Sequence, residues 1–426
     1  MFENGADFAY SRFELMASFG GSYFLKPVNF WGSEFNSMAF FDYAIFMDGI
    51  HFGEIRAYSG ISFRGVNFKS WVRIGGVYDS IANFQGAIFE SDSGFESIRF
   101  NGSARFWKTR FDSTANFGYT RFSSLATFSQ STFRGWVNFK NSEFISFADF
   151  ERVQFDSVSF QNTNFNSVAN FNEAKFQGKV NLNGCLLPDT LIFTGVQSSQ
   201  EIDFTYALTD SIQSGDRCVI DLYGTDLSKI KFDYSRFKIL TDSSKYQRRQ
   251  LGNIYEKILK MQNEQGFLDG YEVVDKEYRQ FKNTYNKSGF SYFLGAISSW
   301  YERTVWDYGY RKELIFLWTF VLFAFFFFVN HLLFPYLNRC VYRIDNTYGQ
   351  TPQALLLRNE LLTVIRLFKI RNIFNALFYT SLVFFGLRLN TDKIQFKHFI
   401  GASYLLIQYT IGIICLAYLA NVIILS

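Results

Sequence analysis

The sequence has few of the residues and motifs from which enzyme and metal sites are usually built. Its 4 cysteines lie far apart along 426 residues, which argues against a disulfide scaffold and a zinc site. Its 3 histidines are isolated from one another and from any cysteine: His51, His331 and His398. It has no phosphate-binding glycine loop, GxSxG, HExxH or dinucleotide fingerprint. We therefore expect no enzyme, no catalytic residue, no cofactor and no metal.

A strong charge of one sign is also missing from the first half. Residues 1–240 carry 25 acidic and 21 basic side chains, a net charge of −4, with no basic stripe. We therefore expect no nucleic-acid partner. Residues 241–426 carry the remaining +8 next to long apolar runs, which suggests a membrane surface. The N-terminal MFENGADFAYSRF lacks the basic patch and apolar run of a secretion signal, so we expect residues 1–240 to be cytoplasmic.

Phenylalanine, by contrast, is abundant, with 55 residues, and much of it recurs at a fixed spacing. In ANFGYTRFSSLATFSQSTF it returns at Phe117, Phe122 and Phe128, with a small residue two positions before each. A helix face recurs at three or four residues and a half-buried strand at two, so neither explains steps of five or six. The pattern weakens between Phe68 and Phe84.

A step of five or six means that the chain turns a corner between successive buried residues. Four sides would make one coil of about 22 residues, and stacked coils would lie about 4.8 Å apart, as hydrogen-bonded strands do. Each coil would bury a ring of Phe side chains on the next, as in a solenoid. These residues therefore predict a packed core and leave no interior pocket.

This repeat resembles the pentapeptide-repeat family in a Phe-rich variant, over most of residues 6–240. The resemblance implies a right-handed quadrilateral β-helix for residues 1–240. A strict five-residue step returns at Leu222, Leu227, Phe232 and Phe237, whereas 188–217 is irregular and predicts a loop or a damaged coil. Some family members mimic duplex DNA, but a net charge of −4 is too weak for that role.

Residues 241–298 predict a helical hairpin connector. Apolar residues three or four apart run from Leu251 to Met261 and again from Tyr271 to Phe281, with a joint at Gly266–Gly270. We expect the hairpin to cap the last coil or to pack on another subunit. An aromatic juxtamembrane segment follows at 299–313, where aromatic rings and cations suit the headgroup layer, or alternatively ordinary helix packing. Its candidate coupling residues are Trp300, Trp306, Tyr308 and Arg311.

Two segments predict transmembrane helices, at 314–336 and 397–426. Residues 314–334 and 399–426 contain no charged side chain and are long enough to cross a bilayer core. A polar and basic loop, 337–371, follows the first span, and part of it is typical of an amphipathic surface helix. The apolar segment at 372–390 is too short for a clear third span and could be a re-entrant helix, sheltered by protein or water.

The order of span, short apolar helix and span resembles two-transmembrane cation-channel modules. The resemblance covers about residues 300–426 and implies a tetramer, with ALFYTSLVFFG as pore helix. It places candidate pore and filter residues at Thr380, Ser381, Gly386 and Arg388. Potassium-selective members carry a TVGYG-like filter, whereas this chain has SLVFFGLRLNTD, so potassium selectivity is not predicted.

The second predicted span has two stripes of polar or small residues. Ser403, Thr410, Ala417 and Asn421 fall on one helix face within about 40°. Gln408, Gly412 and Cys415 fall on the opposite face. Either stripe lines water or lets another helix approach closely. We take the first as the candidate pore lining.

Two functions follow from these patterns. The first is an oligomeric ion channel or pore former in a membrane, here a bacterial inner membrane, with the β-helix as a cytosolic regulatory or assembly domain. The second is a membrane-anchored scaffold whose β-helix binds a cytosolic protein partner without conduction. Topology stays open at one point: a cytoplasmic N-terminus places loop 337–371 outside, although six Lys and Arg residues between 339 and 371 favour the inside.

Overall fold

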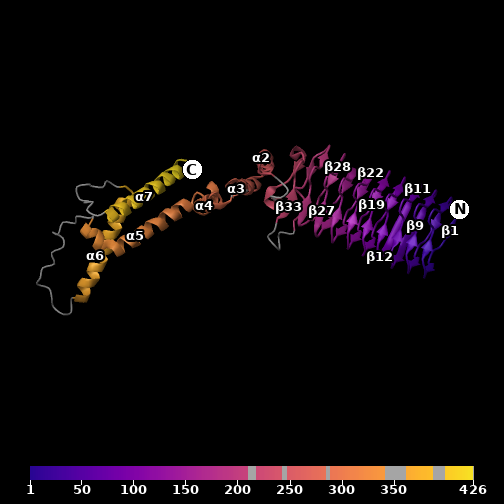
Figure 1. The fold of residues 1–426 in the computed structure, drawn as a ribbon, viewed down its shortest axis with the longest axis horizontal. Helices are drawn as coiled ribbons and strands as arrows, with labels where there is room; N and C mark the ends of the chain where they lie inside the picture. The colour runs from indigo at the N-terminus through magenta and orange to yellow at the C-terminus, as the bar shows by residue number, and fades with distance from the viewer. Residues whose placement is uncertain (210–216, 242–246, 285–287, 341–360, 387–398, 426) are drawn as a thin grey trace. The chain divides into compact units, whose positions relative to one another are not determined.

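The computed structural model describes residues 1–209, 217–241, 247–284, 288–340, 361–386 and 399–425. The chain divides into two compact units, Met1–Asn286 and Lys287–Ser426. The first unit is a β-solenoid closed by two helices, and the second is helical (Figure 1). Arg388 lies outside the described residues.

The solenoid runs from β1 (Ala6–Asp7) to β35 (Phe237–Ile239), and most of its strands are two residues long. Each strand pairs in parallel with the strand one coil later. Ala115 in β19 (Ala115–Asn116) pairs with Val137 in β22 (Thr132–Asn138), and Val137 pairs with Val158 in β25 (Gln154–Ser159). The regular coils are therefore 21 or 22 residues long, as the Phe spacing predicted, whereas Thr190 pairs with Val219, 29 residues later.

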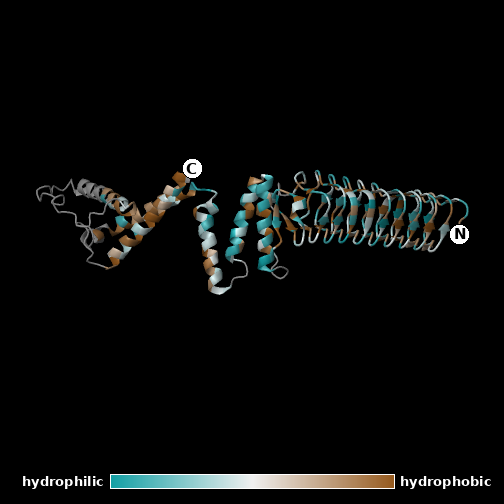
Figure 2. Cartoon of the chain, turned by 90° about the horizontal axis from the view of Figure 1, so that it is seen from above, coloured by the Kyte–Doolittle hydropathy of each residue, from teal (hydrophilic) through white to brown (hydrophobic). Residues whose placement is uncertain are grey.

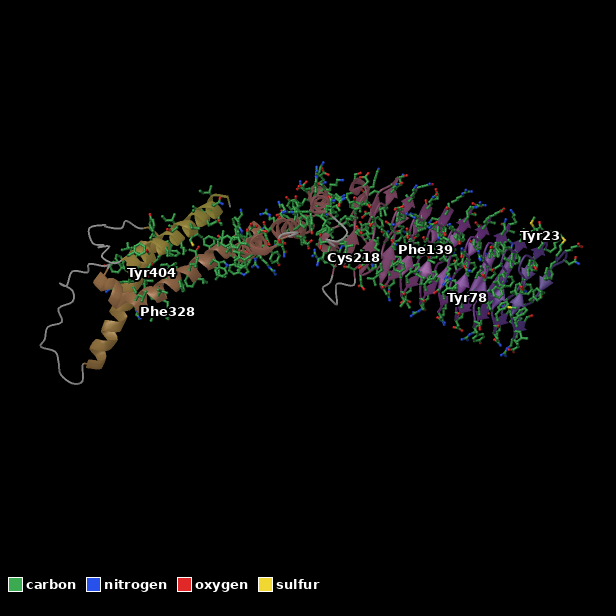
Figure 3. The ribbon with its side chains drawn as sticks, viewed as in Figure 1. Tyr23, Tyr78, Phe139, Cys218, Phe328 and Tyr404 are labelled. Atoms are coloured by element: carbon green, nitrogen blue, oxygen red, sulfur yellow. The ribbon has the colours of Figure 1, made fainter. Side chains whose placement is uncertain are left out.

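The core consists of stacked columns of Phe rings. Phe117 stacks on Phe139 one coil later, with ring centroids 5.0 Å apart and an angle of 12° between the planes. Neighbouring columns meet edge to face, as Phe106 and Phe117 do at 5.3 Å and 89°. Both arrangements are those that aromatic quadrupoles favour. Figure 3 marks Phe139 and Tyr78 among these side chains. The prediction of a parallel solenoid with a Phe core is confirmed.

Some of the small positions two residues before a Phe are occupied by Ser or Thr, whose hydroxyl groups form hydrogen bonds. Thr120 is 1% exposed, and its hydroxyl donates to the carbonyl oxygen of Phe95 at 2.6 Å. Ser142 donates in the same way to Phe117 at 2.7 Å, and Thr163 to Phe139 at 2.6 Å. Buried polar groups need such partners. These buried hydroxyl groups are therefore paired with backbone carbonyl groups of the preceding coil.

The segments with weak patterns still form coils. β9 (Ile50–Ala57) and β12 (Val72–Tyr78) are extended strands in which one corner is straightened. Further on, β30 (Thr190–Ile192) pairs with both β27 (Val168–Asn170) and β33 (Cys218–Asp221). The irregular sequence after residue 188 therefore does not interrupt the stack at β30.

The expected hairpin caps the last coil. It consists of α2 (Arg248–Gln265) and α3 (Leu268–Thr284), and α2 ends at Gly266, whose φ is +75°. The buried Gln262 amide donates to the Phe232 carbonyl at 2.8 Å, and its oxygen accepts from the Tyr234 N–H at 3.0 Å. The side chain thus replaces the strand pairing that the last coil lacks.

The second unit contains α4 (Gly289–Val305), η3 (Asp307–Gly309), α5 (Leu314–Cys340), α6 (Leu361–Phe384) and α7 (Phe399–Leu425). Two helical stretches, Leu314–Leu333 and Phe399–Ile424, are long and apolar enough to cross a membrane. Figure 2 shows that they are coloured more hydrophobic than α2 and α3.

Two boundaries differ from those expected. The predicted connector, 241–298, includes the first ten residues of α4, because GFSYFLGAIS continues without proline into the next helical stretch. The segment predicted at 372–390 belongs to a longer helix, since α6 begins eleven residues earlier, at Leu361, inside the predicted loop 337–371. LLTVIRLFKIR contains neither Gly nor Pro, so nothing local ends the helix there.

Candidate functional site

A buried cluster of polar side chains joins the three long helices of the second unit. It consists of Asn330 in α5, Thr380 in α6, and Tyr404 and Gln408 in α7, and we call it the polar cluster. Asn330, Thr380 and Gln408 are at most 1% exposed. Polar groups are costly inside an apolar bundle unless they bond one another. The cluster therefore fixes which faces of the three helices meet.

Asn330 is the centre of this cluster. Its amide nitrogen donates to the Thr380 hydroxyl at 2.8 Å and to Gln408 Oε1 at 3.2 Å. Its amide oxygen accepts from the Tyr404 hydroxyl at 2.8 Å. The Gln408 amide donates to the backbone carbonyl of Thr380 at 3.3 Å. Each polar side chain thus has a partner on another helix.

The carboxyl end of α6 lies halfway along the other two helices. Phe384, the last residue of α6, packs with Phe326, the thirteenth of the 27 residues of α5. Its carbonyl oxygen would lie 1.7 Å from a Cβ placed on Gly412, the fourteenth of the 27 residues of α7. Only glycine permits this approach. The helix therefore ends at mid-depth of the bundle.

Three of the predicted filter residues lie in the last turns of α6 or just beyond its end. Thr380 belongs to the polar cluster, and its hydroxyl also donates to the Ala376 carbonyl at 2.6 Å. The Ser381 hydroxyl donates to the Leu377 carbonyl at 2.9 Å. Gly386 follows the helix with φ of +64° and is exposed. Thr380 is thus a packing residue within one chain, whereas Ser381 and Gly386 lie near the end of α6.

The two stripes of α7 have different environments. Gln408, Gly412 and Cys415 are buried against α5 and α6. Of the candidate pore-lining residues, Thr410, Ala417 and Asn421 are exposed, and Ser403 is half-buried. The Thr410 hydroxyl donates to the Leu406 carbonyl of its own helix at 2.8 Å. The stripe with Gln408, Gly412 and Cys415 therefore packs on other helices of the same chain. The stripe with the candidate pore-lining residues is largely exposed on the surface of the three helices.

The juxtamembrane residues lie around the kink between α4 and α5. Trp300 is 62% exposed, whereas Tyr308 is 6% exposed and its hydroxyl donates to the Ser299 carbonyl at 3.4 Å. The Trp306 ring meets the Tyr418 ring of α7 edge to face at 5.4 Å. Arg311 pairs with Glu313 at 3.1 Å. Trp306 and Tyr308 therefore connect the kink to α7 and α4, respectively. Trp300 and Arg311 are exposed.

A mostly apolar cavity of about 300 Å³ lies between α4, α5 and α7. Its walls include Tyr301 and Val305 of α4, Trp318 of α5, and Ile414 and Tyr418 of α7. Its size is at the lower end of the range for small-molecule sites, but few polar groups converge on it. The cavity marks loose packing where α4 meets the two long helices.

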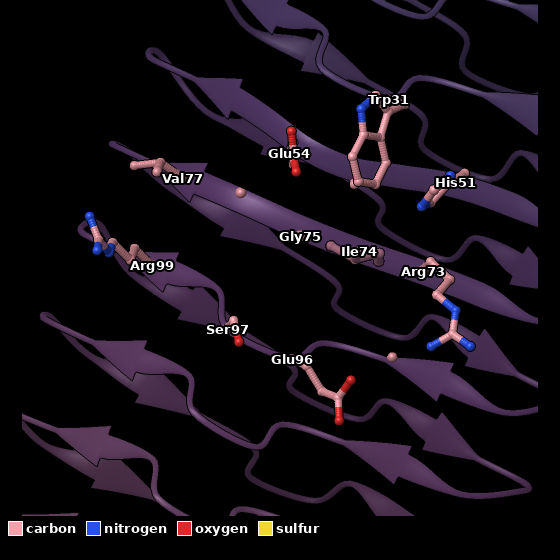
Figure 4. A pocket seen from close by; sticks show the side chains of 13 residues that line it. Trp31, His51, Glu54, Arg73, Ile74, Gly75, Val77, Glu96, Ser97 and Arg99 are labelled. Atoms are coloured by element: carbon pink, nitrogen blue, oxygen red, sulfur yellow. The ribbon is translucent and has the colours of Figure 1, made fainter.

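The solenoid carries a surface groove of about 420 Å³ (Figure 4). It forms where β9 and β12 straighten one corner, and its lining includes Gly53 and Gly76. A Cβ on Gly53 would lie 2.5 Å from the Trp31 ring, and one on Gly76 would lie 2.0 Å from a backbone oxygen. The repeat weakened in this region because extended glycine-rich backbone replaced a turn.

The groove brings aromatic and charged side chains together. The Trp31 and His51 rings lie 4.7 Å apart, and partial burial together with nearby Arg73 lowers the pKa of His51. Glu96 and Arg99 also line the groove. Such a mixed lining suits contact with another molecule and lacks an arrangement of nucleophile and base. Among the described residues, no group of three or more His, Cys, Asp or Glu could hold a metal ion.

Sequence reasoning missed the central role of Asn330 and the groove. The only signals in the sequence were the amide side chain of Asn330 within an apolar span and the weakened repeat between Phe68 and Phe84. Asn330 and Gln408 are 78 residues apart, so neither periodicity nor composition could pair them.

Comparison with known proteins supports the repeat assignment. Residues 95–143 match a family model described as pentapeptide repeats (9 copies), and this stretch lies within the regular coils. No curated protein and no solved structure matches the chain. No catalytic family is indicated. The first unit is therefore a parallel β-solenoid that contains pentapeptide repeats, joined in one chain to a helical unit with two helices that could cross a membrane.

Proposed function

We propose that this chain is a subunit of an oligomeric ion-conducting membrane pore, with the solenoid as its cytosolic regulatory or assembly domain. The observation that carries the proposal is the position of the carboxyl end of α6 beside Gly412, at mid-length of α7. The 13 residues from Asn372 to Phe384 cover about 20 Å, enough to reach the middle of a core about 30 Å thick.

A helix that ends at this depth needs shelter for its last carbonyl groups. Lipid cannot bond them, so non-helical backbone at mid-depth has to line a water-filled cavity or be buried in protein. Within one chain, Gly386 just beyond the end of α6 is exposed. Several copies around an axis would supply that shelter, because two spans cannot enclose a pore alone. The resemblance to two-transmembrane channel modules favours a tetramer.

Charge selectivity depends on two opposing features near this end of α6. The carboxyl end of a helix carries a partial negative charge, which favours cations. Arg388 follows two residues after Gly386, where it would favour anions. With no TVGYG-like segment in SLVFFGLRLNTD, we propose a pore without a potassium filter. The exposed stripe of α7, with Thr410, Ala417 and Asn421, is the proposed lining.

The test is conductance of the purified chain in planar bilayers, with symmetric and asymmetric salt. We expect discrete unitary currents that change in Asn421→Leu and Thr410→Leu but not in Ile413→Leu, an exposed apolar control on the same helix. The reversal potential then gives the charge selectivity. A silent bilayer together with a monomeric particle in detergent would overturn the proposal.

A second candidate is a membrane-anchored scaffold without conduction. The groove with Trp31, Arg73 and Arg99 favours it, because aromatic and Arg side chains are common anchors at protein interfaces. A partner would then contact the solenoid while the long helices only anchor it. Silent bilayers, a monomeric particle and a protein partner whose binding is lost in Trp31→Ala would favour this alternative.

A further inference from the structure

The helix α4 presents its large apolar side chains to the outside of the second unit. Six of them lie at positions that recur three or four residues apart and fall within about 120° at 100° per residue. All six are between 39% and 74% exposed: Phe290, Phe293, Leu294, Ile297, Trp300 and Tyr301.

The opposite side of α4 carries its two buried residues, although Tyr292, also on that side, is 51% exposed. Gly295 and Ser299 are the buried residues of this helix, and neither has a large side chain. A surface helix of a water-soluble protein has the reverse arrangement, with its apolar stripe inward and its polar face in water. An exposed stripe of this size needs to be covered by something apolar.

The position of α4 indicates what covers it. The Trp318 indole N–H of α5 donates to the Thr304 carbonyl of α4 at 2.7 Å, and Trp306 packs on Tyr418 of α7. These contacts hold the carboxyl end of α4 beside one end of each membrane-spanning candidate. Figure 1 shows α4 nearly end-on, whereas α5 runs across the view, so the two helices lie at an angle to each other.

The kink between the helices creates this angle. Asp307 and Tyr308 have φ of +50° and +58°, and Gly309 has φ of +96°. Such left-handed residues end a helix and redirect the chain. The chain therefore turns sharply just before α5 begins at Leu314.

We propose that α4 lies in the plane of the membrane interface, with its apolar stripe among the acyl chains. The inference rests on the proposed spanning of α5 and α7. The occupant is a bilayer surface because α4 and its kink contact both spanning candidates, whose large exposed side chains are apolar, and because the stripe contains no charged residue. The charged residues of α4, Glu302 and Arg303, lie off the stripe. Trp and Tyr at one end suit the headgroup layer.

The test uses the full chain in phosphatidylcholine vesicles, with its four cysteines replaced by alanine and one new cysteine carrying an environment-sensitive fluorophore. The new positions are Ile297→Cys on the stripe, Arg303→Cys on the exposed polar side, and Phe320→Cys on the exterior of α5. Quenching by spin-labelled lipid reports lipid contact, and quenching by iodide reports water contact.

We expect the label at 297 to be quenched by lipid and at least about fivefold less by iodide than the label at 303. A label at 320 in lipid with a label at 297 in water would overturn this inference and leave the proposed pore intact. A label at 297 shielded from both quenchers would mean that protein, such as a second copy, covers the stripe. A label at 320 in water would overturn the proposed span and this inference together.

A second measurement keeps the inference testable if the cysteine-free chain does not fold. Wild-type tryptophan emission is compared with that of Trp300→Phe in vesicles containing brominated lipid. We expect the lipid-quenched part of the emission to fall in Trp300→Phe. An unchanged quenched part would place Trp300 away from lipid and overturn the inference.

Discussion

The Asn330 side-chain amide donates a hydrogen bond of 2.8 Å to the Thr380 hydroxyl, 50 residues later in the chain. Both side chains are almost completely buried, and Gln408 and Tyr404 complete the same cluster. One amide thus contacts α6 and α7 at once. The hydrogen bonds of this one residue therefore connect all three helices.

Asn330→Leu should destabilise the helical unit by about 1–2 kcal/mol, because Gln408 and Tyr404 each lose a partner in an apolar environment. Thermal unfolding of the full chain in detergent measures the effect. Asn421→Leu is the matched control, since Asn421 is an exposed amide on α7. Equal stability of Asn330→Leu and the wild type would show that the polar cluster does not hold the bundle.

Gly412→Ala should separate α6 from α7. The new methyl group would lie 1.7 Å from the Phe384 carbonyl oxygen, which is backbone and cannot rotate away. Overpacking of this kind costs about 1–3 kcal/mol, and unfolding in detergent measures it. Ala420→Leu, at an exposed position of the same helix, serves as the control. A destabilisation that is no larger in Gly412→Ala than in Ala420→Leu would contradict the close approach.

Phe117→Ala should destabilise the middle of the solenoid by about 3–5 kcal/mol, because it leaves a cavity between stacked rings. Amide hydrogen exchange of the full chain should rise in the coils around β19, where Phe95 and Phe139 lose their stacking partner. Tyr119→Ala removes an aromatic side chain that is 65% exposed, from the same coil. Similar exchange in the two variants would argue against a Phe core.

Tyr234→Phe tests the cap at the end of the solenoid. The Tyr234 hydroxyl donates to Glu277 at 2.6 Å and accepts from the Ile239 N–H at 3.1 Å. Losing these bonds should cost about 1–2 kcal/mol at neutral pH, measured by hydrogen exchange in α2 and α3. Tyr206→Phe, at an exposed position, is the control.

The same residue predicts a pH dependence. Burial, and then the nearby Glu277 carboxylate, raise the pKa of Tyr234 well above its usual range. The stabilisation is therefore complete below the ordinary tyrosine pKa of about 10 and decreases as the pH rises above it. The wild-type cap should lose protection above that pH, and Tyr234→Phe should lose less. Identical alkaline profiles of the two proteins would contradict a role for this hydroxyl.

Local patterns were sufficient for the solenoid. The spacing of Phe117, Phe122 and Phe128 predicted both the corners and the core, because each step is set by neighbours within one side of a coil. Long apolar runs likewise predicted the two long helices, since helix length and composition are local properties. The start of α6 at Leu361 was missed, because sequence alone did not distinguish a surface helix from a continuation of the next one.

The sequence by itself therefore determined a Phe-cored solenoid, a helical hairpin and two apolar helices. Tertiary structure alone decided that Asn330, Thr380 and Gln408 meet, that α6 ends beside Gly412, and that the apolar stripe of α4 faces outward. Periodicity tells which residues share a face, but not which face is covered or by what. That choice depends on contacts between residues far apart in the chain, whose energies no local pattern contains.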